Sequence, residues 1–174
     1  GADGEYCVVK SGYGLEVAKT ADVSAGDIVT HCYQGHDDLV IDEGGHILSD
    51  VWQARERGVL FDVGHGGGSF NFEVARSSLA DGFKADLIST DIHAHSLNRT
   101  VNSLPDAAAK LMSLGVGLSE VIERTTSAAA AAIGRSDELG TLRVGTVADL
   151  AAFEIVEGEF EFHDCHGQVN TGSQ

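Results

Sequence analysis

Three short apolar runs, each followed by a turn and a helical stretch, constrain the fold of this chain more than any other feature. The runs cover residues 27–32, 59–65 and 86–91, and helical patterns follow at 51–57, 70–79, 107–114 and 118–133. Repetition of strand, loop and helix predicts parallel strands joined by crossover helices. The runs are almost continuously apolar, which is typical of strands buried on both faces. The sequence therefore predicts an α/β fold, either a parallel sheet or part of a (β/α) barrel.

The pattern changes after a soft boundary at residues 134–139. Residues 139–150 combine turn glycines with short β segments, and residues 151–155 and 160–162 are expected to continue as strands. We therefore expect two parts, an α/β part over residues 1–135 and a small β segment over residues 136–174.

Each of the three predicted strands ends in a polar side chain, namely His31, His65 or Asp91. The carboxyl ends of parallel strands share one edge, where α/β proteins build their sites. Two imidazoles and a carboxylate suit a divalent metal ion. Taken singly, each histidine could be structural, and Asp91 could cap the next loop. The glycines at 66–68 could cradle a phosphate, although no lysine follows them as in a P-loop.

Other histidines lie near these strand ends or in loops. His93 and His95 follow Asp91 closely, so one of them could contact substrate or support Asp91, or both could be solvated. His36 and His46 lie in acidic, glycine-rich sequence and are expected at the surface. His163 and His166 lie in the β tail, far along the chain from the strand ends, and receive no role.

Charge and composition exclude several classes of partner. The net charge of −16 disfavours nucleic acid and anionic membranes. No apolar run approaches the roughly 18–20 residues that span a bilayer, and no signal peptide is visible. Three scattered cysteines argue against a disulfide framework and favour a reducing setting. We expect a cytoplasmic protein with a small-molecule substrate and no nucleic-acid or membrane partner.

Four segments, taken in order, resemble the amidohydrolase superfamily, and most closely its dihydroorotase-like amidohydrolase/deacetylase members. They are GDIVTHC at 26–32, FDVGHG at 61–66, ISTDIH at 88–93 and GTVADL at 145–150. The resemblance implies the C-terminal part of a (β/α)8 TIM barrel with a small β-sandwich segment. It also implies one or two divalent ions, usually zinc.

The resemblance gives the candidate residues distinct roles. His31 is similar to the metal-binding histidine of the sixth barrel strand. Asp91 is similar to the eighth-strand aspartate, which binds metal and shuttles a proton. His65 falls on the seventh strand, where substrate contacts are commoner, so His65, Gly66, Gly67 and His93 are expected to bind substrate.

The implied reaction is hydrolysis of an amide or ester bond, in a cyclic amide, an N-acyl or an O-acyl compound, by a metal-activated water with Asp91 as proton shuttle. The family's His-x-His pair, fourth-strand lysine and fifth-strand histidine have no clear counterpart in this sequence. The alternative is therefore a catalytically incomplete barrel fragment that binds a metal or small molecule, or assembles with another chain. A homo-oligomer is compatible with either hypothesis.

Overall fold

A parallel sheet lies at the centre of the molecule. The computed structural model describes residues 8–10, 23–36, 40–97 and 99–173. The three strands are β1 (Val8–Lys10), β2 (Ile28–Thr30) and β3 (Leu60–Phe61), which pair in the order β1-β2-β3. An isolated parallel bridge joins Asp62 to Leu87 beside β3. Neighbours in the sheet are therefore neighbours along the chain, which is compatible with the expected α/β fold.

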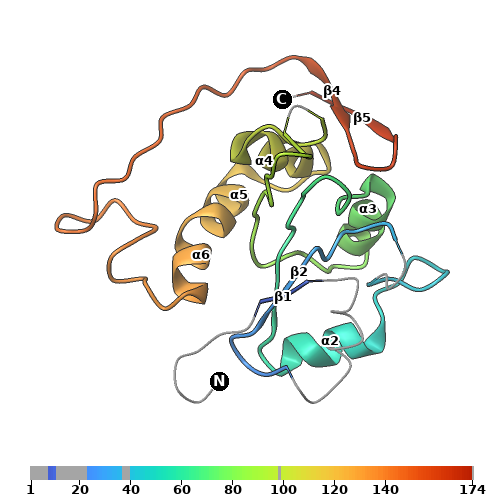
Figure 1. Ribbon diagram of the computed structural model, residues 1–174, viewed down its shortest axis with the longest axis horizontal. Helices are drawn as coiled ribbons and strands as arrows, with labels where there is room; N and C mark the ends of the chain where they lie inside the picture. The colour runs from blue at the N-terminus through green and yellow to red at the C-terminus, as the bar shows by residue number, and fades with distance from the viewer. Residues whose placement is uncertain (1–7, 11–22, 37–39, 98, 174) are drawn as a thin grey trace.

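Five helices are described, and they surround the sheet (Figure 1). They are α2 (Ser49–Glu56), α3 (Phe72–Ala80), α4 (Leu104–Ser113), α5 (Leu118–Thr125) and α6 (Ser127–Ala132). Local chemistry sets where two of them begin. The side chain of Asn71 accepts hydrogen bonds from the first amides of α3, and the hydroxyl of Ser103 accepts one at the start of α4. Within the described part of the chain, no helix has both the length and the apolar surface needed to cross a bilayer.

The core lies between the sheet and these helices. Val29, Phe61 and Val63 are almost completely buried, and Phe83 packs edge-on against Phe61 at 5.1 Å between ring centres. Burial of such side chains is the main stabilising contribution in a domain of this size.

Two expected elements differ from the structure. Residues 86–91 form no regular strand, because their ladder beside β3 is reduced to the isolated Asp62–Leu87 bridge and a few bonds such as Val63 N to Leu87 O. The single helix expected over residues 118–133 is broken at Thr126. The hydroxyl groups of Thr125 and Thr126 donate to carbonyls one turn earlier, a pattern that bends helices.

The C-terminal region is partly different from expectation. The strand expected at 160–162 is confirmed as β4 (Glu159–His163), which pairs antiparallel with β5 (Val169–Ser173). The strands expected within 139–155 are wrong. This stretch runs as a long arc outside the packed body (Figure 1). Its apolar side chains are exposed, Leu142 at 82% and Val144 fully. An alternating sequence forms a strand only beside a partner edge, and the described residues offer none here.

The β4–β5 hairpin packs back onto the α/β part. The buried carboxylate of Asp164 accepts hydrogen bonds from the amides of Phe72, His166 and Gln168. The amide of Cys165 donates to Phe70 O, which adds a second tie to the start of α3. The hairpin is therefore held close to the carboxyl ends of the strands.

Candidate active site

His31 and Asp91 meet beyond the carboxyl ends of the sheet. Nε2 of His31 lies 3.8 Å from Oδ2 of Asp91. His31 is buried, and the Asp91 side chain is about one-third exposed. Among the described residues, these two are the non-glycine residues with positive φ, at 66° and 44°. Left-handed backbone costs energy for such residues and concentrates at functional sites. The strain therefore points independently to the pair that the sequence singles out.

The His31 ring is oriented by the turn after β3. Its Nδ1 lies 2.6 Å from the carbonyl oxygen of Gly64, which can only accept, so Nδ1 carries the hydrogen. Nε2 is then the nitrogen with a lone pair, and it faces Asp91. Gly64 must lack a side chain, because a Cβ there would lie 2.6 Å from His31 Nδ1 and 2.2 Å from Thr30 Oγ1.

Asp62 joins the end of β2, which carries His31, to the segment 86–91, which carries Asp91. Its Oδ2 accepts a hydrogen bond from Thr30 Oγ1 at 2.5 Å and from Ser89 Oγ at 2.6 Å. Thr30 directly precedes His31, and Ser89 lies two residues before Asp91. Burial raises the pKa of Asp62, while the two hydroxyl donors lower it. The carboxyl group thus fixes the spacing of the two strand ends.

His65 lies below the surface rather than at the open face. Its side chain is completely buried and stacks on Phe70, with ring centres 4.7 Å apart. Nε2 lies 3.1 Å from Nζ of Lys110, and Nδ1 lies 3.0 Å from Gly66 O. Burial, and then the nearby Lys110 charge, lower the pKa of His65 to about 4. Both ring nitrogens have partners within the chain, so the geometry does not support direct substrate contact by this side chain.

The other expected substrate-binding residues lie at or near the turn and differ in exposure. Gly66 is buried against Asp91, since a Cβ there would lie 3.0 Å from Asp91 Oδ2. Gly67 and His93 are exposed, and the His93 ring approaches Gly67. Nδ1 of His93 accepts a hydrogen bond from the amide of His95. Substrate contact by Gly66, Gly67 and His93 stays a prediction.

The donor pair fits part of a metal site. An imidazole nitrogen and a carboxylate oxygen are ligands that zinc prefers. Their 3.8 Å separation suits two ligands that each lie about 2.0–2.2 Å from one ion. The Gly64 carbonyl that holds the His31 ring is the kind of partner that orients metal-binding histidines. Among the described residues, no group of three or more histidine, cysteine, aspartate or glutamate side chains is arranged to hold an ion.

The tail lies nearer to the site than its position in the sequence suggests. The thiol of Cys165 is 3.6 Å from Gly66 O, and the ring of His166 lies 4.8 Å from that of His36. The expectation that His166 is remote from the strand ends is therefore wrong, because the β4–β5 hairpin folds back over the turn. His46 is exposed as expected and pairs with Asp81.

Two residues of this region were not singled out in the sequence. Asp62 is an acid inside an otherwise apolar strand, and Lys110 lies on the face of α4 that also carries the buried Ala107 and Leu111. A charged residue at a buried position of a strand or helix is the signal that would have found both.

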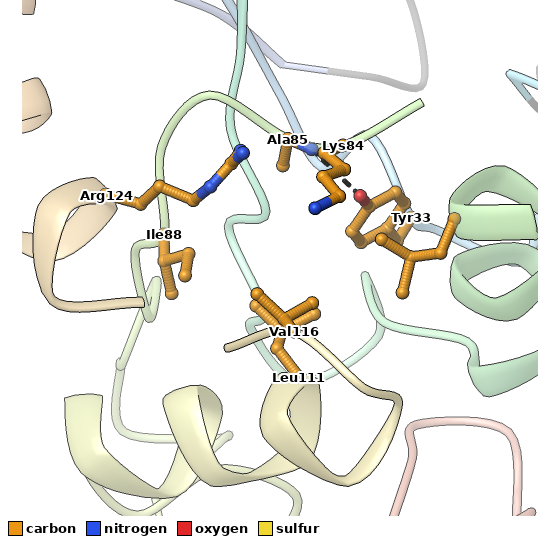
Figure 2. Close-up of a pocket in the computed structure, with 8 residues that line it drawn as sticks. Tyr33, Lys84, Ala85, Ile88, Leu111, Val116 and Arg124 are labelled. Carbon is orange, nitrogen blue, oxygen red and sulfur yellow. Dashed lines mark hydrogen bonds between the residues drawn. The ribbon is translucent and has the colours of Figure 1, made fainter. Parts of the chain in front are cut away.

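Neither described cavity is lined by His31 or Asp91. The pocket in Figure 2 is lined by side chains such as Tyr33, Ile88 and Leu111, and its volume of about 10 Å³ has room for about one water molecule. A groove of about 440 Å³ runs between α5–α6 and the beginnings of the strands, at Gly26 and Leu60. That groove lies at the opposite end of the strands from His31 and Asp91.

Comparisons with known proteins identify similar sequences and folds. The sequence profile of the amidohydrolase family matches residues 69–172. A deacetylase of Enterococcus faecalis is 40% identical over 151 residues, which are 86% of this chain and 41% of that protein. The crystal structure of an adenine deaminase superposes with a TM-score of 0.84 at 37% identity, over 91% of this chain and 43% of its own. The crystal structure of a dihydroorotase superposes with a TM-score of 0.82 at 33% identity, over 97% of this chain and 44% of the dihydroorotase chain. The chain spans less than half the length of each of these relatives.

Proposed function

This chain belongs to the amidohydrolase family, and we propose that it contributes His31 and Asp91 to a metal-dependent site that hydrolyses an amide or ester bond. The observation that carries the proposal is the 3.8 Å approach of His31 Nε2 to Asp91 Oδ2 beyond the carboxyl ends of parallel strands. Family membership and the deacetylase relative support amide hydrolysis.

We assign separate roles to the residues of this chain. His31 and Asp91 would hold a divalent ion, with zinc as the usual choice that the family resemblance implies. When bound, such an ion polarises a carbonyl and lowers the pKa of water. Asp91 takes a proton onto its carboxylate from the attacking water and returns it to the leaving group. Gly66, Gly67 and His93 line the side from which substrate approaches.

The proposed architecture follows from strand order. The chain-ordered parallel pairing of β1, β2 and β3, continued by the Asp62–Leu87 bridge, agrees with the last strands of a (β/α)8 barrel. We assign residues 1–135 to this barrel part. Residues 136–174 form a segment of a small β-sandwich, and the exposed apolar side chains of the arc would pack there against further strands.

The test is turnover by the Asp91→Asn variant. The full chain is incubated with zinc and a panel of N-acetyl amino acids, and acetate release is measured. Asparagine tolerates the left-handed backbone, so the fold should be kept while the proton acceptor is lost. We expect turnover to fall by roughly 1,000-fold or more, even at a zinc concentration high enough to fill part of the weakened site. Asp137→Asn, at an exposed position, should change nothing, and near-native turnover in Asp91→Asn would refute the proposal.

A second candidate is a binding or assembly module without activity of its own. It is favoured by the finding that only two donors of the usual kinds converge in the described part of the chain. Three results together would favour this candidate over the enzyme. The native chain binds zinc, Asp91→Asn does not, and no probe is turned over.

A further inference from the structure

A buried lysine lies directly behind the glycine turn of the site. Lys110 belongs to α4, and only 4% of its side chain is exposed. Burying an ammonium group costs several kcal/mol unless it is fully paired, and an apolar residue of similar size packs at lower cost. Its presence in the core of a helix face therefore requires a reason beyond packing.

Lys110 has three acceptors around Nζ. The ammonium donates to the carbonyl of Thr100 and to Nε2 of His65 at 3.1 Å, and Asp106 Oδ2 lies 3.7 Å away. Burial lowers the pKa of Lys110, and Asp106 acts against that shift. An ammonium group has hydrogens and no lone pair, so Nε2 of His65 must accept. The ring hydrogen is then on Nδ1, which points to Gly66 O.

This ring is part of a continuous set of contacts that ends at Asp91. Gly66 O accepts from Thr100 Oγ1 at 3.1 Å as well as from His65 Nδ1. The amide of Gly66 donates to Thr90 O at 2.8 Å, directly before Asp91. The α carbon of Gly66 is so close to Asp91 that an added Cβ would lie 3.0 Å from Oδ2. The position of the turn therefore limits where the Asp91 carboxylate can lie.

We propose that Lys110 is a positioning residue, which anchors Nε2 of the His65 ring while the Nδ1–H of the same ring holds Gly66 O, and thereby fixes the glycine turn against the carboxylate of Asp91. The link from the turn to turnover rests on the proposed function of Asp91. The link from Lys110 to His65 does not depend on it.

The first test reads the His65 ring directly. Side-chain ¹⁵N NMR of the full chain at neutral pH should show His65 as neutral, with hydrogen on Nδ1. Lys110→Met keeps the length of the side chain and removes the donor. Gly66 O still keeps the hydrogen on Nδ1, so the tautomer should be unchanged, but the ¹⁵N signal of Nε2 should shift because this nitrogen no longer accepts a hydrogen bond. Leu111→Ala, on the same helix and also buried, should destabilise the protein and leave the Nε2 signal of His65 unchanged. A native spectrum with hydrogen on Nε2 overturns the proposal without any variant.

The second test measures turnover of the N-acetyl amino acid panel. Lys110→Met should lower kcat by roughly 10–100-fold, the effect usually found when a residue that orients an active group is lost. Zinc affinity should fall by a smaller factor than kcat, and Lys110→Arg should recover part of kcat because it restores a donor. If Asp91→Asn is inactive but Lys110→Met keeps a kcat within about twofold of native, the role of Lys110 is refuted and the proposed function stands. Full activity in Asp91→Asn refutes the proposed function and leaves the NMR result to decide the role of Lys110.

Discussion

At the residue scale, the site is marked by backbone conformation as well as by chemistry. His31 and Asp91 both have positive φ, a conformation that costs about 1–3 kcal/mol for residues other than glycine. The hydrogen bond that His31 Nδ1 donates to Gly64 O and the close approach of Gly66 to Asp91 keep both side chains in place. A residue retained in a strained conformation, at a position where glycine would be more stable, indicates that its side chain is needed.

This strain predicts that two substitutions at position 91 differ in their effect on the free energy of unfolding. Asp91→Gly should keep or raise the free energy of unfolding, by up to about 1 kcal/mol, because glycine adopts positive φ without strain. Asp91→Ala should keep the backbone strain, so its free energy of unfolding should not rise. Urea denaturation of both variants measures the difference. Equal stability of the two variants would show that position 91 is not strained.

At the element scale, β2, β3 and most helices could be predicted from the sequence, because apolar runs and turn residues are local signals. β1 was not predicted, and the strand expected at 86–91 does not form. The ends of β2 and β3 were predictable as the place where His31 and His65 leave the sheet. The partners of His65 could not be predicted, because they depend on how deeply α4 packs against the turn. No local sequence pattern encodes that depth. The extra strands expected within 139–155 failed for a related reason, since strand formation needs a partner that the pattern itself does not reveal.

The turn after β3 makes a prediction about close approach. Gly64→Ala should strongly destabilise the protein and abolish zinc binding, because its Cβ would overlap Thr30 Oγ1 and His31 Nδ1. Gly82 also has positive φ, at 83°, and has open space around it. Gly82→Ala should therefore cost only about 1–2 kcal/mol and bind zinc normally. Thermal unfolding and zinc titration of both variants check this, and equal losses would show that the contact with His31 is unimportant.

At the scale of the whole molecule, stability should depend on pH through His65. Its pKa is about 4 in the folded protein, mainly because of burial, and about 6.5 in an unfolded chain. On acidification the unfolded chain therefore takes up this proton first. The His65 contribution is complete above pH 6.5 and is lost as pH falls toward 4, by about 3 kcal/mol. Asp62 acts in the opposite direction, because burial raises its pKa.

The comparison with His65→Gln isolates this contribution. Glutamine can accept from Lys110 and does not titrate, so the variant should lose less stability than the native chain between pH 6.5 and 4. Urea denaturation at several pH values provides the measurement. If the free energies of unfolding of the two proteins change in parallel with pH, folding does not lower the pKa of His65.

The claim that His31 and Asp91 share a divalent ion is tested most directly by calorimetric titration of the full chain with zinc. The native chain and His46→Asn, whose histidine is exposed and paired with Asp81, should bind zinc alike. His31→Asn and Asp91→Asn should each weaken binding by more than about 100-fold, because losing a ligand costs more than losing a residue that orients one. Native affinity in both of these variants would contradict the account.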